Sequence, residues 1–328
     1  MYLLEFAGED DAFAAAEAGA AAASVSVVAP GVGTARSLDA ERATALAYTR
    51  HAGELVGRCT GDIEDAVRLL DAANLHRTGS VAVRARAPRG SDADTQRAER
   101  ELGGVLAARG YDIELDDPDH ELRAVAAGGE WFLAWSVVDT VRDFGTRQPT
   151  DRPFFQPGSM DPLLARAVVN LAGVGPGDAL LDPMCGTGGV PIEAGLVGAR
   201  VVGTDAQEKM VRGAAENLRE FLGTGNAAVA RADATRLPFS DNAFDAVAFD
   251  APYGRQSKIE THSLETLVAN ALAEAKRVAD RCVLLADRDW REAARSAGWE
   301  VEARFERRVH RSLTRYVLVL SAEFREEM

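Results

Sequence analysis

Residues 179–190 read ALLDPMCGTGGV, a short apolar run that ends in an acid and leads into closely spaced glycines. Glycines at a strand-to-helix turn let backbone N–H groups approach a ligand closely. Dinucleotide-binding enzymes space these glycines as GxGxxG, so that a pyrophosphate meets the helix N-terminus. Here the glycines are bunched as GTGG, and Asp182 precedes them. This arrangement does not suit a pyrophosphate, and it disfavours a nucleotide-dependent oxidoreductase.

The chain from Asp161 onward alternates short apolar runs with helical patterns, which predicts an α/β fold with a doubly wound parallel sheet. The runs that follow the first are ARVVGTD, AAVARAD, FDAVAFD and RCVLLAD. The chain then carries WEVEARFERRV and TRYVLVLSAEF, two long strand patterns with no helix between them. Such a pair predicts a hairpin, so we expect the sheet to carry an antiparallel strand at its end.

Four successive predicted strands finish in aspartates, namely Asp182, Asp205, Asp233 and Asp250. Because ligands bind at the carboxyl ends of parallel strands, these carboxylates are expected to meet at one site. Asp182 can pair with a cationic group, such as the amino group or sulfonium of S-adenosylmethionine. Asp205 can accept from ribose hydroxyls, and Asp233 from the exocyclic amine of adenine. A single such acid is equally well explained as a helix cap or turn residue, but the series with the glycine loop favours a ligand site.

The series DPMCGTGG, GTD, RAD and DAPY resembles the class I methyltransferases that use S-adenosyl-L-methionine. Over roughly residues 150–328, the resemblance implies a Rossmann-like fold with a mostly parallel, seven-stranded sheet and one antiparallel strand. The residues that it places around the cofactor are Asp182, Cys185, Gly186, Thr187, Gly188, Asp205, Ala206, Asp233, Ala234 and Asp250. Methyltransferases of this type often carry an upstream segment that closes over the methionine end. We expect Phe155, Pro157 and Ser159 to play this part.

The last strand of the series ends in Asp250-Ala251-Pro252-Tyr253, a carboxylate, a rigid turn and an aromatic ring. These groups suit the methylation of a planar exocyclic amine, whose lone pair is delocalised into its ring. Asp250 can accept one N–H and the Ala251 carbonyl the other, which favours a nitrogen that becomes tetrahedral. Pro252 would fix the turn, and Tyr253 would stack on the base for roughly 1–3 kcal/mol.

This tetrapeptide resembles the (Asp/Asn)-Pro-Pro-(Tyr/Phe) signature of amino-group methyltransferases, from which it departs at Ala251. The substitution keeps the carbonyl and reduces the rigidity of the turn. The tetrapeptide could instead be a purely structural strand end with a proline turn. Its place in the series, after three other strand-end acids that are predicted to bind a ligand, favours a catalytic role. A base within folded RNA would have to be flipped out to reach this site.

The N-terminal half resembles RNA-modifying enzymes. GSVAVRARAPRG and RAERELGGVLAARGYDIELDDPDHELRA resemble the THUMP module, which recognises the acceptor end of tRNA. We expect a ferredoxin-like part over residues 1–55, a THUMP RNA-binding domain over 56–148 and the methyltransferase domain over 149–328, with the boundary in a proline-rich loop. Without the resemblance, the arginines of this half are better explained as a solvated face.

The order of motifs along most of the chain resembles the archaeal tRNA (guanine-10-N2) methyltransferases, which form N2-methyl- and then N2,N2-dimethylguanosine. The resemblance implies tRNA as the partner. Guanine and adenine both present a planar amine, so another tRNA or rRNA guanosine or adenosine stays open as the substrate. A tRNA-binding protein with weakened catalysis is a further alternative, supported by Ala251.

The net charge of -14 is unusual for an RNA-binding protein, because RNA binding depends on phosphate neutralisation. Locally, ARFERRVHRSLTRY and GRQSKI are basic, and we expect them to form a basic rim around the pocket. An arginine-rich hairpin paired with acids is the structural alternative. The predicted RNA-binding residues are Arg84, Arg86, Arg255, Lys258, Arg307, Arg308, Arg311 and Arg315.

The composition indicates a protein of concentrated salt. Acids number 51 against 37 bases, of which only Lys209, Lys258 and Lys276 are lysine. Three cysteines without a CxxC pair and scattered histidines argue against a disulfide framework and a metal site. The alanine-rich stretch from Phe13 to Gly33 is interrupted by Glu17 and is too weakly apolar to span a membrane. We expect a cytoplasmic monomer.

Overall fold

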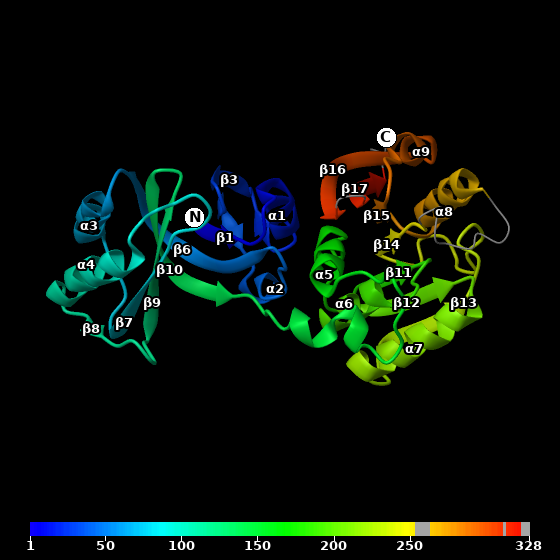
Figure 1. The fold of residues 1–328 in the computed structure, drawn as a ribbon, viewed down its shortest axis with the longest axis horizontal. Coiled ribbons are helices and arrows are strands. Elements are labelled where there is room, and N and C mark those ends of the chain that lie inside the picture. The colour runs from blue at the N-terminus through cyan, green and yellow to red at the C-terminus, as the bar shows by residue number, and fades with distance from the viewer. Residues whose placement is uncertain (253–262, 311–312, 323–328) are drawn as a thin grey trace, which may run out of the picture. The chain divides into compact units, whose positions relative to one another are not determined.

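The computed structural model describes residues 1–252, 263–310 and 313–322 of the chain. Its contacts divide the chain into two compact units, Met1–Val141 and Arg142–Met328 (Figure 1). Tyr253, Arg255, Lys258 and Arg311, which the sequence assigns to the site or to RNA, lie outside the described residues.

The first unit is built on an eight-stranded sheet with the strand order β3-β4-β1-β6-β10-β9-β7-β8. Its strands are β1 (Tyr2–Phe6), β3 (Ser26–Ala29), β4 (Val32–Ala35), β6 (Thr49–Thr60), β7 (Ser80–Arg86), β8 (Asp112–Ile113), β9 (His120–Ala127) and β10 (Glu130–Asp139). A separate pair is formed by β2 (Ala22–Ala23) and β5 (Ser37–Leu38), and the helices are α1 (Asp11–Ala18), α2 (Ala40–Ala43), α3 (Ile63–Ala72) and α4 (Thr95–Ala108). Because β6 pairs with both β1 and β10, the sheet continues without a break across residue 55.

The helices α3 and α4 form where capping residues precede an apolar stripe. Asp62 and Asp65 make a reciprocal capping box at the start of α3, and the Asp94 carboxylate caps α4. Leu70 and Leu102 bury their side chains in one core with residues of β7, β9 and β10. The strand β9 was not predicted from the sequence, and β8 is shorter than the predicted strand in YDIELDDPD.

The second unit begins with the 3-10 turns η1 (Phe144–Arg147) and η2 (Pro149–Asp151) and contains a seven-stranded sheet of order β13-β12-β11-β14-β15-β17-β16. Its strands are β11 (Ala179–Asp182), β12 (Arg200–Asp205), β13 (Ala227–Arg231), β14 (Ala246–Asp250), β15 (Arg281–Ala286), β16 (Trp299–His310) and β17 (Leu313–Ala322). Its helices are α5 (Pro162–Leu171), α6 (Gly189–Leu196), α7 (Glu208–Leu222), α8 (Leu264–Val278) and α9 (Arg291–Ser296). The strands β11 to β15 are parallel, which confirms the predicted class I methyltransferase fold.

The hairpin pattern had led us to expect the antiparallel strand at the end of the sheet. The antiparallel strand, β17, is instead an interior strand. It lies between β15 and β16, and β16 forms the edge. Residues Val317 to Leu320 are buried on both faces, which suits an interior strand. By contrast, β16 alternates charged residues such as Glu302 and Arg304 with apolar ones, which suits an edge.

The helices of this unit cover both faces of its sheet (Figure 1). Helix α8 packs with α9 on one face, where Phe249, Leu284 and Leu318 belong to their common core. On the other face, α6 contacts both α5 and α7. The strand order reverses between β12-β11 and β11-β14, so this is the topological switch point at which α/β sheets bind ligands. None of the described helices is long and apolar enough to cross a membrane.

Candidate active site

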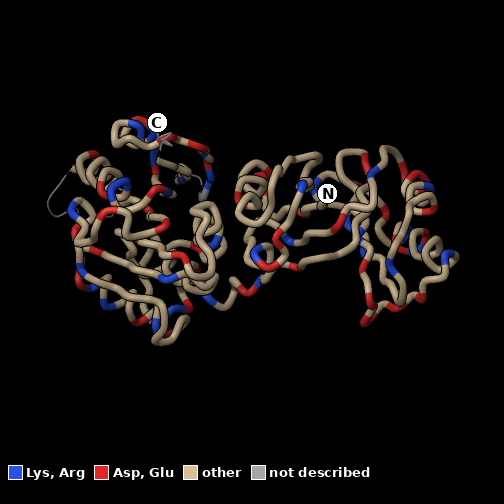
Figure 2. The backbone as a smooth tube through the Cα atoms, turned by 180° about the vertical axis from the view of Figure 1, so that it is seen from behind, with Lys and Arg blue, Asp and Glu red and all other residues tan. Residues whose placement is uncertain are grey.

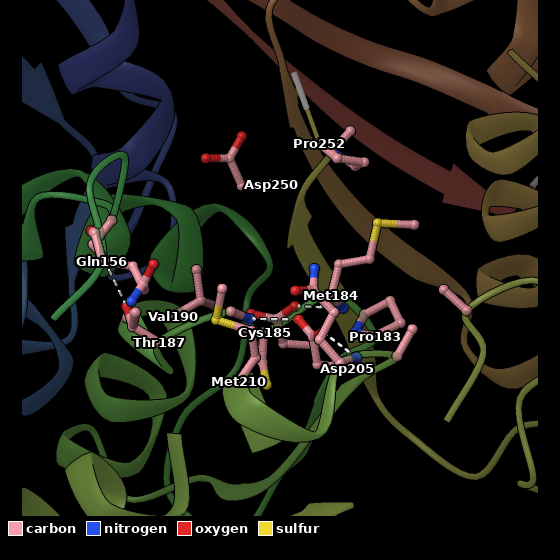
Figure 3. Close-up of a pocket in the computed structure, with 18 of the residues that line it drawn as sticks. Gln156, Pro183, Met184, Cys185, Thr187, Val190, Asp205, Met210, Asp250 and Pro252 are labelled. Atoms are coloured by element: carbon pink, nitrogen blue, oxygen red, sulfur yellow. Dashed lines mark hydrogen bonds between the residues drawn. The ribbon is translucent and has the colours of Figure 1, made fainter. Parts of the chain in front are cut away.

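A cavity of about 970 Å³ lies at the switch point. Its walls include all four aspartates that the sequence assigns to strand ends, Asp182, Asp205, Asp233 and Asp250. Figure 3 labels Asp205 and Asp250. Three of them are the last residues of β11, β12 and β14, whereas Asp233 follows β13 by two residues. The parallel strands therefore bring together acids that lie far apart in the sequence.

The glycine loop connects β11 to α6 and shapes the floor of the cavity. Gly186 has φ 52° and Gly188 has φ 84°, in the left-handed region that side chains rarely adopt. A Cβ on Gly188 would also lie 2.6 Å from Leu218 Cδ1, so this residue lets the loop pack on α7. A Cβ on Gly186 would meet no atom within 4 Å, although this glycine lines the cavity. Gly186 donates its N–H to Asp205 Oδ2 at 3.1 Å, which joins the loop to β12.

Two of the acids are held in a low-dielectric environment. Asp182 is 2 % exposed, and burial raises the pKa of its carboxyl well above the ordinary value, against a hydrogen bond from the Met184 N–H. The negative charges of Asp205 and Asp250 raise this pKa further. Burial also raises the pKa of Asp205, although the N–H groups of Gln207 and Gly186 donate to it. A cation bound among these acids would favour their ionised forms.

The far side of the cavity is lined by Asp233 and its neighbours. Asp233 is exposed, and its Oδ1 accepts from the Thr235 N–H at 2.9 Å and the Thr235 hydroxyl at 2.8 Å. Ala234 is buried and lines the cavity, as does Ala206 after β12. Lining residues that the sequence analysis did not single out are Gln156, Gly158, Met160, Pro183, Met184, Gly189, Val190, Gln207, Met210, Arg231, Ala232 and Leu267.

The segment before α5 forms another wall of the cavity. Pro157 and Ser159 line the cavity, whereas Phe155 is 43 % exposed and is not among the lining residues. The Thr187 hydroxyl donates to Ser159 Oγ at 3.0 Å, which connects the glycine loop to this segment (Figure 3). Ser159 in turn donates to the Gln156 carbonyl at 2.7 Å.

Asn217 on α7 holds this segment against the glycine loop. Its side chain accepts from the Phe154 N–H and donates to the carbonyls of Phe154 and Thr187, each at 2.8 Å. Gly213, one turn earlier on α7, makes room for the Phe154 ring, because a Cβ there would lie 2.0 Å from Phe154 Cδ1. No sequence pattern pointed to Asn217, since its partners are distant in the chain.

A buried ion cluster lies beneath the same segment. Glu193 of α6 is fully buried and pairs with Arg147 and Arg166, each at 2.9 Å. Arg152 is 4 % exposed and donates to the carbonyls of Arg147 and Met160, each at 3.2 Å. The cluster therefore joins the segment that carries Ser159 to the helices α5 and α6.

The strand end at Asp250 is held on two sides. Ala251 is 3 % exposed, and its N–H donates to the Leu285 carbonyl at 2.8 Å. A proline at this position would have no N–H to donate, so the sheet restrains a turn that the sequence analysis expected to be less rigid. Pro252 lines the cavity beside Asp250 (Figure 3). Arg315 of β17 places its Nη2 3.6 Å from Asp250 Oδ2.

The predicted RNA-binding residues occupy different environments. Arg84 pairs with Glu121 at 3.5 Å and Arg86 with Glu5 at 3.9 Å, both in the first unit. On β16, Arg307 is half-buried and Arg308 is exposed. Arg315 is 6 % exposed, so it is buried within the second unit and does not belong to an exposed basic rim.

Cys185 packs in the protein interior. It is 6 % exposed, and burial and the charge of Asp182 raise the pKa of its thiol well above the ordinary value. A raised pKa leaves the thiol protonated and unreactive. Within the described ranges, no group of three or more His, Cys, Asp and Glu side chains is placed to hold a metal ion.

Known proteins resemble this chain in sequence and in fold. Residues 149–317 match the family model described as RMKL-like, methyltransferase domain. The tRNA (guanine(10)-N2)-dimethyltransferase of Methanothermobacter thermautotrophicus is 36% identical over 300 residues, which cover 86% of this chain and 87% of that protein. The chain belongs to the family of archaeal tRNA (guanine(10)-N2)-dimethyltransferases.

A second relative supports the family assignment, and a solved structure supports the fold. The tRNA (guanine(10)-N2)-dimethyltransferase of Pyrococcus abyssi is 34% identical over 266 residues, with 80% of this chain and 79% of that protein covered. The crystal structure of SMU.472, solved in complex with SAH, has a TM-score of 0.50 and 14% identity, and the match covers 98% of each chain. At this identity the likeness concerns the fold alone.

Proposed function

We propose that this protein transfers methyl groups from S-adenosyl-L-methionine to the exocyclic N2 amine of guanosine 10 in tRNA, to give first the mono- and then the dimethylated base. The observation that carries the proposal is the match to tRNA (guanine(10)-N2)-dimethyltransferases over most of both chains. The cavity at the switch point is the proposed site of the cofactor, and Asp250 in its wall is the proposed site of the amine.

The cavity residues fit S-adenosylmethionine in charge and shape. The buried Asp182 suits a cationic amino group, because a bound positive charge would favour the ionised carboxylate that burial disfavours. Asp205 suits the ribose hydroxyls and Asp233 the adenine amine. Gly186 leaves open space beside the loop, and Cys185, Thr187, Ala206 and Ala234 line the cavity. Ser159 and Pro157 are proposed to cover the methionine end.

S-adenosylmethionine supplies a methyl group on a sulfonium; the guanine nitrogen forms the new C–N bond as the S–C bond breaks, and sulfur keeps that electron pair. The protein residues position the nitrogen. Asp250 accepts one N–H of the amine and the Ala251 carbonyl accepts the other, which aims the lone pair at the methyl group. The nitrogen then loses a proton from its cationic form, so a strong base is not needed. Tyr253 is proposed to stack on the base.

The N-terminal half of the chain is proposed to bind tRNA through a THUMP domain over residues 56–148, with a ferredoxin-like part over 1–55. The methyltransferase domain would begin at residue 149. Among the basic residues, Arg255, Lys258, Arg307, Arg308 and Arg311 are proposed to contact phosphates next to the pocket, and Arg84 and Arg86 to do so on the first unit. We propose that the enzyme acts as a cytoplasmic monomer in a cell with concentrated salt.

A nucleoside map tests the proposed function. The full chain is incubated with unmodified tRNA transcripts and S-adenosylmethionine labelled in the methyl group, at low and at molar KCl. We expect label at guanosine 10, and none in a transcript with adenosine at that position. Label only at another guanosine or at an adenosine would contradict the choice of nucleotide, and an Asp250→Ala variant with full activity would contradict the proposed site.

A further inference from the structure

The ion pair between Arg315 and Asp250 connects the proposed amine site to the far end of the chain. Arg315 lies on β17 and Asp250 on β14, with β15 between them. The Arg315 side chain is 7% exposed and that of Asp250 is 21% exposed. The pair is thus largely shielded from water, where charge interactions are stronger than at an open surface.

The register of the sheet explains how Arg315 reaches across a strand. Asp250 pairs with Leu285 of β15, and Leu285 pairs with Val317 of β17. Paired residues share a face, and Arg315 precedes Val317 by two residues, so Asp250 and Arg315 lie on the same face. This is the face opposite α8, because Leu284 and Leu318 pack against α8 on the other one.

A second acid, Asp182, lies near Asp250. Asp182 lies close enough for the charges of Asp205 and Asp250 to raise its pKa. Like charges at one site favour protonation, whereas a positive neighbour favours the carboxylate. A protonated Asp250 would lose an acceptor for the amine N–H, and the charge of Arg315 opposes that protonation.

Other charged groups around the pair come from neighbouring elements. Arg307 of β16 is the register partner of Arg315 and shares its face. Asp287 and Arg288 follow the carboxyl end of β15 and pair with each other at 3.5 Å. Arg288 also pairs with Glu265 of α8 at 3.4 Å. The side chains of Asp287, Arg288 and Glu265 are more exposed than that of Arg315, so water screens them more strongly. Arg307 is half-buried.

We propose that Arg315 is a positioning residue for methyl transfer, which orients the Asp250 carboxylate toward the amine and keeps it ionised. The inference rests on the proposed function, since it assigns Arg315 to the amine site of that reaction. It differs from the role that the sequence suggested, in which Arg315 contacts RNA phosphate. Arg315 is buried and its Nη2 lies 3.6 Å from Asp250 Oδ2, which suits the positioning role better than a contact with phosphate.

The test compares Arg315→Met, Arg315→Lys and the wild-type full chain in methyl transfer to tRNA, as kcat and KM against pH. In Arg315→Met we expect kcat at neutral pH to fall roughly 100-fold, as for a misplaced catalytic group. The acid limb of its pH profile should move up by about one pH unit or more, since a nearby opposite charge shifts a carboxyl by that amount. Arg315→Lys keeps the charge without the planar fork, so its acid limb should stay near that of the wild type while kcat falls less.

Arg281→Met is the matched control. It removes another arginine of this sheet, one that pairs with Glu302 at 3.5 Å at the opposite end of β15. We expect its pH profile to match that of the wild type. Binding of S-adenosylmethionine by calorimetry checks that each variant is folded, and we expect Arg315→Lys to bind as the wild type does.

Three results would contradict the inference. Either the pH profile and kcat of Arg315→Met equal those of the wild type, or this variant raises only the KM for tRNA and flattens its salt dependence, as loss of a phosphate contact would. The third result concerns Arg315→Lys. A role for the charge would be contradicted if this variant bound the cofactor normally but lost as much activity as Arg315→Met and showed the same shift of the acid limb. The proposed function fails separately, when the wild type labels no nucleoside of tRNA.

Discussion

Asp182 combines full burial with a negative environment, and this has a consequence for cofactor binding. Because burial raises its pKa, the carboxyl keeps a proton above the pH at which an exposed aspartate would lose it. Binding of a cationic amino group favours the ionised form, so a proton must leave as the cofactor enters. The affinity for S-adenosylmethionine should therefore depend on pH through this residue and, more weakly, through Asp205.

We predict that affinity for S-adenosylmethionine rises with pH through the raised pKa of Asp182 and then levels off. Calorimetry in two buffers with different ionisation enthalpies should detect proton release on binding. Asp182→Asn should bind more weakly and release fewer protons, whereas Asp117→Asn, at an exposed acid of the first unit, should behave as the wild type. Equal proton release by Asp182→Asn and the wild type would refute the linkage.

The same shift has a defined sign for stability. A carboxyl with a raised pKa in the folded state stabilises the fold below the ordinary pKa of aspartate, and this contribution is lost as pH rises through the folded value. The cofactor-free protein should thus lose stability over that window, and Asp182→Asn should lose less of it.

Ala251 shows how one residue can depart from a family signature without loss of order. Its N–H is part of the pairing between β14 and β15. Ala251→Pro should therefore destabilise the protein, because the Leu285 carbonyl would be left without this donor in a buried place, at a cost of about 1–3 kcal/mol. Urea unfolding measures the change. Ala251→Gly keeps the N–H and should cost only about 0.5–1 kcal/mol; a proline variant as stable as the glycine variant would contradict this reading.

At the scale of elements, Asn217 connects three segments: α7, the glycine loop and the segment before α5. Asn217→Leu removes three hydrogen bonds and leaves the Phe154 and Thr187 backbone groups without these partners. We predict that its Kd for S-adenosylmethionine rises about tenfold or more, since each unsatisfied buried group costs about 1–3 kcal/mol. Calorimetry measures it.

Glu216→Ala alters the adjacent, exposed residue of α7 and should bind the cofactor as the wild type does. Asn217→Asp keeps the acceptor for the Phe154 N–H and loses both donors, so its Kd should lie between those of the wild type and Asn217→Leu. Normal binding by Asn217→Leu would show that the segment is held by its other anchors, Arg152 and Ser159.

Most elements of the second unit could be predicted because its strands and helices alternate with clear punctuation. The strand-end aspartates followed from the same pattern, since parallel strands end at one edge. Asn217 could not be found in this way, because a helix pattern shows which face is buried but not which distant backbone groups lie there. Arg315 was identified as a basic residue, but its environment depends on where β17 inserts in the sheet, which a hairpin pattern does not specify.

At the scale of the whole molecule, charge is the dominant feature. Acidic and basic residues are interspersed along both units (Figure 2), yet acids exceed bases by 14. Many arginines pair with acids within the described part of the chain, as Arg123 does with Glu5 at 2.8 Å. The excess acids then have few internal partners, so the folded protein is expected to be more stable where salt screens the repulsion between them.

We predict that the melting temperature rises when KCl is increased from low to molar concentration, because the Debye length falls to about 3 Å at 1 M. Scanning calorimetry measures it, with sucrose of equal osmolality as the control for solvent exclusion. Equal stabilisation by sucrose and KCl would show that the net charge is not the cause.

The first unit was harder to predict than the second. Its expected division at residue 55 stays a prediction, and the continuity of β6 across that position shows that the two parts share one sheet. The central strand β9 escaped detection because HELRAVAA begins with charged residues and carries no turn signal of its own. Its position between β7 and β10 depends on pairings with segments before and after it in the chain.

The interior position of β17 also means that the sheet can be completed only late in protein synthesis. The ribosome releases β11 to β15 before β17, yet β17 lies between β15 and the edge strand β16. A nascent chain can therefore assemble the acids of the cavity while β15 still presents an open edge and Arg315 has not arrived. In the proposed mechanism the amine site is complete only when β17 has inserted, so we expect a chain that lacks β17 to be inactive.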